Sequence, residues 1–228
     1  MKKLFDSLVR LLYPHVCLLC GADLVEGEEQ VCLVCRSDLP YTRMHLEPDN
    51  RLEQLFWGQV PIQRATALFY FEKGGMVQKL LHQLKYKDNR EMGVLLGRCL
   101  GEEIAGSPVA EADCIVPVPL HPRRQKLRGY NQSRLIADGM AEVLHLPVAD
   151  GVLKRVRANE TQTHKNAFER WRNSESLFAV GERESLAGRR VLLVDDVVTT
   201  GATFTASAKA LLQIPNIQIN CASVAMAI

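Results

Sequence analysis

The sequence has little net charge, no long apolar run and no repeated or low-complexity segment. Its formal charge is +2 over 228 residues, so no global field marks it as a nucleic-acid binder. No apolar run approaches the ~18 residues that a membrane-spanning helix needs. Apolar residues make up 47% and charged residues 24%, the ordinary balance of a soluble globular protein. This composition excludes a disordered, a fibrous or a coiled-coil chain.

The N-terminal segment lacks the features of a secretory signal. Asp6 and Arg10 interrupt its apolar stretch, and no small-residue cleavage site follows. Leucines recur at helical spacing before Val16, which predicts an amphipathic docking helix. We therefore expect a soluble, cytoplasmic protein without membrane insertion.

The cysteines are unevenly distributed along the chain. Four of the seven fall between positions 17 and 35, and the other three are widely scattered. An odd total with isolated thiols does not indicate a disulfide framework and fits a reducing cytosol. At ~150 residues per domain, the length favours one domain plus an appendage.

The clustered cysteines form two CxxC pairs, Cys17–Cys20 and Cys32–Cys35. Two such pairs complete the tetrahedral thiolate coordination of a zinc ion. Buried free cysteines or a redox pair are the alternative, but a redox CxxC normally stands alone beside a βαβ pattern. A site closed by four thiolates leaves no position for substrate. The spacing therefore predicts a structural zinc site in a small module, residues 1–45.

Residues 46–228 alternate strand patterns with helical patterns. The strands are expected at 64–71, 112–118, 176–180, 190–194 and 217–227, with a helix at 202–212. This alternation predicts an α/β domain with a mainly parallel sheet flanked by helices.

The most specific stretch is VLLVDDVVTTGAT, residues 191–203. An apolar strand ends in Asp195 and Asp196, a turn with threonine hydroxyls and a glycine follows, and a helix begins. Ligands of open α/β sheets bind at the carboxyl ends of strands. The turn amides and the start of the helix can hold an anion, whereas the carboxylates accept hydrogen bonds from a vicinal diol. Together they predict a pocket for a ribose 5-phosphate.

Other interpretations of this stretch remain. Adjacent aspartates after a strand also occur in phospho-acceptor and Mg²⁺ sites. A Walker loop is excluded, because no lysine follows the glycine in the required pattern. A merely structural turn is disfavoured, because paired carboxylates destabilise a strand end unless something compensates.

The stretch resembles the signature of the type I phosphoribosyltransferases. Over nearly its full length the chain resembles the ComF (GntX) family of competence-associated phosphoribosyltransferase-like proteins. The matching pieces besides the cysteines are Leu84-Lys85-Tyr86, Val116-Pro117-Val118-Pro119-Leu120-His121, Arg128-Gly129-Tyr130-Asn131-Gln132, and Thr161, Gln162, Arg172 and Asn173.

The resemblance implies a type I phosphoribosyltransferase-like fold and a pocket for 5-phosphoribosyl-1-pyrophosphate (PRPP), held with Mg²⁺. By similarity, Asp195 and Asp196 engage the ribose hydroxyls. The loop after Pro117 and Val118 takes the place of the pyrophosphate loop, and residues 161–172 that of the mobile flap. The turn that would hold the 5-phosphate consists of Val198, Thr199, Thr200, Gly201, Ala202 and Thr203.

Cations are concentrated in residues 121–172, which contain eleven Lys/Arg and five Asp/Glu, a local charge of +6. Such a concentration favours a polyanion, and pyrophosphate supplies one. A solvated face is the alternative for any single arginine. We expect Lys126, Arg128 and Lys165 to contact pyrophosphate, with Lys85 as a further candidate.

A phosphoribosyl transferase stabilises the charge of departing pyrophosphate and positions a nucleophile, without a covalent residue of its own. The family is often labelled with glutamine amidophosphoribosyl transfer. This sequence departs from that pattern, because Met1-Lys2-Lys3 offers no N-terminal cysteine and no glutaminase-sized domain precedes the transferase. Glutamine-dependent transfer is therefore not expected.

The second hypothesis is an accessory factor that binds single-stranded nucleic acid and whose PRPP pocket is regulatory or vestigial. Tyr130, His164, Phe168 and Trp171 interleave with the cations, as in sites that stack bases on aromatic faces. Core packing explains such aromatics equally well. The family's association with DNA uptake implies single-stranded DNA, a DNA-uptake helicase or other competence proteins as partners.

Overall fold

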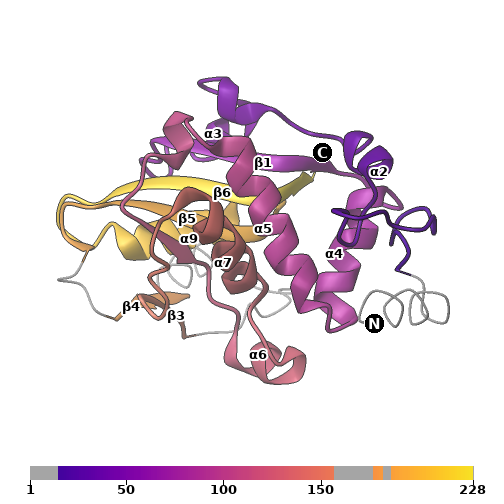
Figure 1. Ribbon diagram of the computed structural model, residues 1–228. Coiled ribbons are helices and arrows are strands. Elements are labelled where there is room, and N and C mark those ends of the chain that lie inside the picture. The colour runs from indigo at the N-terminus through magenta and orange to yellow at the C-terminus, as the bar shows by residue number, and fades with distance from the viewer. Residues whose placement is uncertain (1–14, 157–176, 182–185, 228) are drawn as a thin grey trace.

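A four-stranded sheet forms the centre of the protein (Figure 1). The computed structural model describes residues 15–156, 177–181 and 186–227. The strands, in sheet order, are β1 (Arg64–Phe71), β6 (Gln218–Ala227), β5 (Arg190–Val198) and β2 (Cys114–Pro117). All three neighbouring pairs are parallel, as the alternating sequence pattern predicted.

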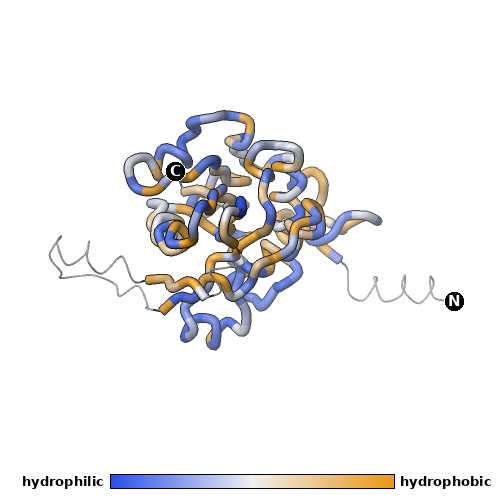
Figure 2. The backbone as a smooth tube through the Cα atoms, turned by 90° about the vertical axis from the view of Figure 1, so that its left-hand side faces the viewer, coloured by the Kyte–Doolittle hydropathy of each residue, from blue (hydrophilic) through white to orange (hydrophobic). Residues whose placement is uncertain are grey.

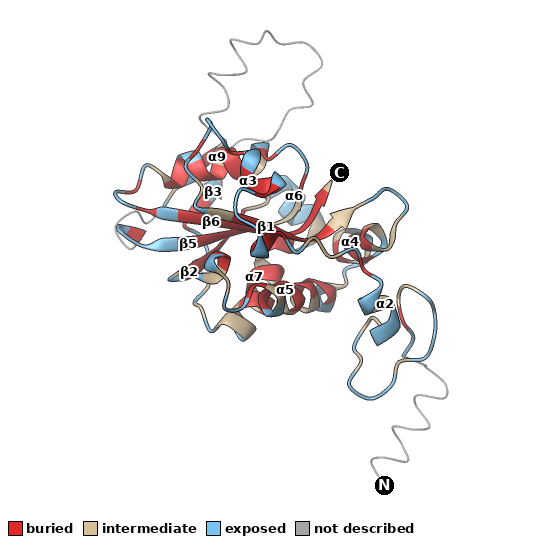
Figure 3. Cartoon of the chain, turned by 90° about the horizontal axis from the view of Figure 1, so that it is seen from above, coloured by how far each residue is buried: buried red, intermediate tan, exposed pale blue. Residues whose placement is uncertain are grey.

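Helices cover both faces of this sheet (Figure 3). One face carries α4 (Met76–Tyr86), α5 (Arg90–Ile104) and α7 (Gln132–Leu144), and the other carries α9 (Ala202–Leu211) with the short α3 (Arg51–Gln54). The predicted helix at 202–212 is thus confirmed to within one residue. None of the described helices has the length and apolar content needed to cross a bilayer.

The central strands are buried on both sides, which explains their continuous apolar runs. Val191 and Leu193 pack into the core beneath α9, whereas Leu192 and Val194 pack into the core beneath α4, α5 and α7. All four are completely buried. Hydrophobic segments accordingly gather in the interior, and the loops at the periphery are largely hydrophilic (Figure 2).

Two predicted segments differ from the structure. The strand expected at 190–194 continues to Val198, because β6 supplies parallel partners as far as Met226. Asp195 and Asp196 therefore lie inside the last part of β5. The basic stretch after Val118, expected as a loop, contains the helix α6 (Pro122–Arg128), which begins with a proline at its first position.

The strand expected at 176–180 exists as β4 (Phe178–Val180) but does not join the parallel sheet. It pairs antiparallel with β3 (Leu153–Arg155). Each strand has three residues, of which only the first is buried. Such a short ribbon with one covered face suits antiparallel pairing better than the doubly buried parallel sheet.

Glycines bring α5 and α7 into backbone contact. A Cβ atom at Gly97 would lie 2.1 Å from the carbonyl oxygen of Ile136, and one at Gly139 would lie 2.1 Å from that of Val94. Real Cβ atoms never approach a carbonyl so closely, so larger residues would force the helices apart. This contact holds the start of α7 close to β5.

The N-terminal module packs beside α5. Arg36, which belongs to α2 (Leu33–Ser37), pairs with Glu102, and Glu29 pairs with Arg98. The amide of Asn89, the N-cap of α5, donates to Gln30 at 2.6 Å. The amphipathic helix predicted before Val16 falls on residues 1–14, outside the described chain.

Candidate functional site

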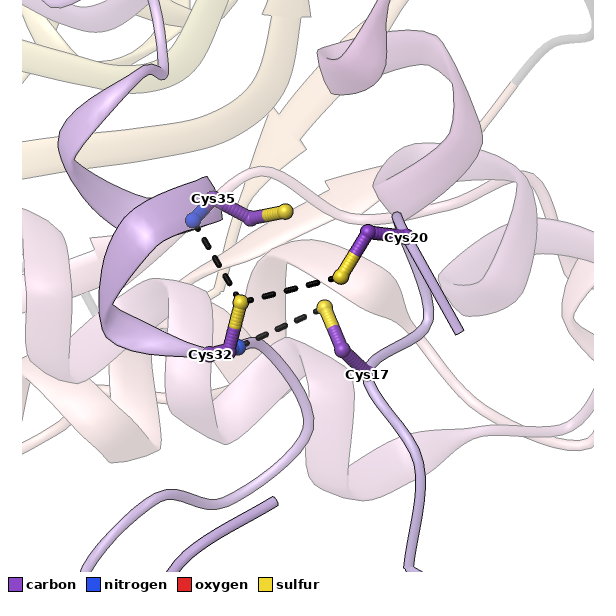
Figure 4. A group of neighbouring side chains, drawn as sticks. All are labelled: Cys17, Cys20, Cys32 and Cys35. Carbon is purple, nitrogen blue, oxygen red and sulfur yellow. Dashed lines mark hydrogen bonds between the residues drawn. The ribbon is translucent and has the colours of Figure 1, made fainter. Parts of the chain in front are cut away.

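Four cysteine side chains converge in the N-terminal module (Figure 4). The sulfur atoms of Cys17, Cys20, Cys32 and Cys35 all lie within 4.8 Å of one another, with 3.8 Å between those of Cys20 and Cys32. Zinc–sulfur bonds of ~2.3 Å in a tetrahedron place neighbouring sulfurs ~3.8 Å apart. The four residues therefore fit a structural zinc ion, as the spacing predicted.

Two backbone N–H groups donate hydrogen bonds to sulfur atoms of this cluster. The N–H of Cys32 donates to Cys17 Sγ, and the N–H of Cys35 donates to Cys32 Sγ, both at 3.4 Å. Burial opposes ionisation of Cys17, but N–H donors of Cys32, Cys20 and Leu19 outweigh it and lower its pKa to about 6. Burial and the neighbouring thiols raise the pKa of Cys35, whereas the lowered pKa of Cys17 favours the thiolate form that zinc binds.

The two adjacent carboxylates of β5 meet side chains from two helices. Asp195 Oδ1 accepts a hydrogen bond from Ser133 Oγ of α7 at 2.8 Å and another from the Asp196 N–H at 2.9 Å. Asp196 Oδ2 lies 2.8 Å from Lys85 Nζ, near the end of α4. This ion pair is largely shielded, since the Lys85 and Asp196 side chains are only 22% and 17% exposed. Lys85 therefore reaches the carboxylate pair.

The two carboxylates differ in their electrostatic surroundings. Burial raises the pKa of Asp195 to about 7, and the neighbouring charge of Asp196 adds to the shift. The hydrogen bonds from Ser133 and the Asp196 N–H, together with the charge of Lys85, partly oppose it. A carboxyl group with this pKa changes its protonation near neutral pH.

The turn after β5 is shaped to expose backbone donors. Gly201, the N-cap of α9, has a φ of +74°, and a Cβ there would also lie 3.2 Å from the Phe56 ring. Both conditions favour glycine. In the described chain no side chain caps this end of α9, whose first N–H groups can donate to an anion. Thr199 and Thr200 are exposed beside it.

The end of β2 lies beside β5 just before the carboxylate pair. Pro117 is in register with Val194, and the Val118 N–H donates to the Val194 carbonyl at 2.9 Å. Asn131, just before α7, donates from its side chain to the Val118 carbonyl at 3.0 Å. The loop that leads into α6 is thereby held beside the strand that carries the carboxylates.

The cations that are predicted to contact pyrophosphate have different surroundings. Lys126 is exposed on α6. The Arg128 guanidinium lies over the Tyr86 ring, 5.5 Å from its centre, and is thus held at the end of α4. Lys165 falls outside the described residues, as do Thr161, Gln162, Arg172 and Asn173. The ligand roles of all these cations stay predictions.

Tyr130 does not serve as a base-stacking surface. It is buried, its hydroxyl donates to the Leu84 carbonyl, and the Arg90 guanidinium lies over its ring at 5.0 Å. Among the described residues near α6, the ring of Tyr86 is exposed, with 66% of the residue surface accessible. His164, Phe168 and Trp171 lie outside the described residues.

Sequence reasoning missed one polar residue of the site. Ser133 resembles any helix-start serine in the sequence, and only the fold brings it to Asp195. No local pattern distinguishes it.

Comparison with known proteins agrees with this organisation. Residues 8–45 match the double zinc ribbon domain, and residues 131–226 match the phosphoribosyl transferase domain. The DNA utilization protein YhgH of Escherichia coli K12 is 32% identical over 219 residues, which cover 89% of this chain and 93% of that protein.

Two competence proteins are also similar. Competence protein F of Haemophilus influenzae is 31% identical over 82% of each chain. Competence protein ComFC of Bacillus subtilis is 26% identical over 89% of this chain and 90% of its own length. Together with the zinc ribbon and the parallel sheet, these similarities show that the chain belongs to the ComF (GntX) family of phosphoribosyltransferase-like proteins.

Proposed function

We propose that this protein binds PRPP at the carboxyl end of β5 and takes part in DNA uptake or utilisation. The observation that carries the proposal is the placement of a carboxylate pair and an uncapped helix start on one continuous segment, β5 to α9. A diol and a phosphate joined by one ribose ring need these two types of group side by side.

Each part of PRPP has a matching part of the site in this proposal. The turn 198–203 holds the 5-phosphate through backbone N–H groups and threonine hydroxyls. Asp195 and Asp196 accept hydrogen bonds from the ribose hydroxyls. The pyrophosphate lies toward the end of β2 and the cations of α6. These assignments extend the sequence-based prediction to the observed positions of the strands.

The Lys85–Asp196 pair explains how two carboxylates can share a site with a polyanion. The ammonium group offsets the charge of Asp196 and leaves one carboxylate oxygen, Oδ1, for a ligand hydroxyl. Carboxylate oxygens are also ligands that Mg²⁺ prefers, so the donor set fits the metal. Bound together with PRPP, Mg²⁺ would neutralise part of the pyrophosphate charge.

The relatives support a role connected with DNA. Two of them are named as competence proteins and one as a DNA utilization protein. We propose a cytoplasmic place of action, where PRPP is available, with a DNA-uptake helicase or other competence proteins as partners. A second candidate function is the binding of single-stranded DNA.

One observation favours this second candidate. Arg123, Arg124 and Lys126 of α6 are all exposed, and the accessible Tyr86 ring lies beside this helix under Arg128. Exposed cations can neutralise phosphates while an aromatic face stacks a base. In this candidate function the basic surface of α6 binds nucleic acid, and the PRPP pocket regulates that binding.

PRPP binding is the first prediction. In isothermal titration with Mg²⁺ we expect saturable binding, weakened at least about tenfold in Asp196→Asn, because this substitution removes a charged acceptor and the partner of Lys85. Asp38→Asn, on the exposed surface of the zinc module, is the matched control and should bind as the wild type does. Absence of binding, or equal binding by both variants, would contradict the proposal.

The second prediction concerns pH. Because the pKa of Asp195 is raised to about 7, its ionised, hydrogen-bond-accepting form increases as the pH rises through neutrality. We expect PRPP affinity to increase roughly tenfold between about pH 6 and about pH 8, with release of a proton. Asp195→Asn should retain only the titration of the ligand's own phosphates. An identical pH profile in wild type and variant would refute this role of Asp195.

Single-stranded DNA binding is tested by a salt series. Changing Arg123, Arg124 and Lys126 to glutamine should reduce the slope of log affinity against log salt by about 0.7 for each phosphate that the variant no longer neutralises. Tyr86→Ala should weaken binding without changing that slope. Lys209→Gln, an exposed position on α9, is the control. If binding survives the triple substitution unchanged, the α6 surface is not the nucleic-acid site.

Metal removal should affect stability and leave the chemistry of the pocket intact. We expect one zinc per chain, and we expect a chelator or Cys32→Ser to unfold the N-terminal module, because a structural zinc site contributes folding free energy directly. The sheet domain has its own core and should stay folded, as checked by metal analysis and thermal unfolding. A metal-free protein with an unchanged unfolding profile would contradict the structural role.

A further inference from the structure

An apolar cavity lies where the N-terminal module meets α4 and α5. It contains about 560 Å³ of space that atoms do not fill, part of it open to solvent. Its apolar lining comes from both sides of the junction and includes Val31, Leu33, Leu80, Met92, Leu96 and Cys99. Leu33 is nevertheless 66% exposed. An exposed leucine that lines an apolar cavity leaves a surface that other apolar side chains can cover.

The described chain begins next to this cavity. The Leu18 N–H donates to the Gln30 carbonyl at 3.0 Å, and Gln30 lies between two cavity-lining residues, Glu29 and Val31. The Asn89 side chain donates to Gln30 and so holds this segment against the start of α5. Residues 1–14 are therefore tethered within a few residues of the cavity. A short tether gives an effective concentration that is roughly millimolar, which favours this segment over a free partner.

The sequence of residues 1–14 matches the apolar lining. Leu4, Leu8, Leu11 and Leu12 recur at the spacing of one helical face. In a helix these leucines extend over about 12 Å, since each residue adds about 1.5 Å. Pro14 disfavours a helix that continues through the preceding residue, so the chain can change direction there. The pattern thus supplies a short leucine face beside the point where the described chain begins.

The charges of the two parts are complementary. Residues 15–39 contain five carboxylates and one arginine, a charge of −4, whereas residues 1–14 contain three cations and one carboxylate, a charge of +2. Glu28, which lines the cavity, accepts hydrogen bonds from the N–H groups of Val25 and Leu33. It has no ion-pair partner among the described residues. A basic segment is therefore attracted to this acidic module.

We propose that residues 1–14 form an amphipathic helix that docks, within the same chain, over the cavity between the zinc module and α4–α5. The leucine face covers Leu33 and the open side of the cavity, and the cations of the segment face the carboxylates of the module. The docked helix then contacts both the module and the sheet domain and fastens one to the other. This inference is independent of the proposed PRPP pocket.

A native thiol reports whether the cavity is covered. Cys99 lines it and is 9% exposed, whereas Cys114 and Cys221 are buried in the core of the sheet domain. The rate at which N-ethylmaleimide alkylates Cys99 is measured by peptide mass spectrometry on the full, zinc-loaded chain. Changing Leu8 and Leu11 together to glutamine should accelerate this reaction at least about fivefold, because the thiol reacts from states in which the segment has left the cavity.

Matched variants separate docking from general destabilisation. Ser7→Gln changes a polar position of the same segment and should leave the Cys99 rate unchanged. Leu33→Gln should accelerate the reaction, whereas Val34→Gln, at the adjacent exposed position that does not line the cavity, should not. Adding Leu33→Gln to the leucine double variant should have little further effect, because both remove the same contact. Zinc content and thermal unfolding verify that each variant is folded.

Three results would overturn the inference. The first is an equal Cys99 rate in the wild type and in the leucine double variant. The second is an independent, multiplicative effect of Leu33→Gln and the double variant, which would show that they do not share a contact. The third is a wild-type rate that falls with protein concentration while ultracentrifugation shows a dimer that the double variant abolishes. That result would assign the leucine face to a second copy of the chain.

Discussion

Two adjacent carboxylates at the end of a buried strand are the arrangement on which the candidate site depends. The apolar residues 191–194 insert β5 into both cores, and this burial carries Asp195 and Asp196 to a position with little solvent. Two negative charges so close together repel each other, and the fold stabilises each carboxylate through a different partner. Ser133 donates a hydrogen bond to Asp195, and Lys85 pairs with Asp196. The ends of α7 and α4 must therefore meet β5.

The packing of the helices secures this compensation. The close contact between α5 and α7 at Gly97 and Gly139 holds α7 near the sheet, and so keeps Ser133 within reach of Asp195. The zinc module in turn packs along α5 through paired charges. The N-terminal module therefore contacts the same helix layer that holds Ser133 beside the sheet.

Local patterns predicted the parts of the protein whose groups are neighbours in sequence. Two CxxC pairs define a metal site because each pair brings its thiolates together within one turn, and the structure places the four sulfurs together. The segment from β5 to α9 was predictable for the same reason. Tyr130 could not be assigned in this way, because its burial follows from tertiary packing, in which its hydroxyl donates to the carbonyl of Leu84 on another helix.

The zinc ligands, the parallel α/β architecture and the turn that exposes the first N–H groups of α9 follow from local spacing and strand–helix alternation, which act over a few residues. Tertiary structure decided which side chains complete the site. Lys85, already a candidate from the sequence, and Ser133, which no local pattern indicated, come from α4 and α7, and the chain must fold before the ion pair and the hydrogen bond reach the carboxylates of β5. Electrostatic compensation is a property of distances in space, and residue spacing along the chain does not contain those distances.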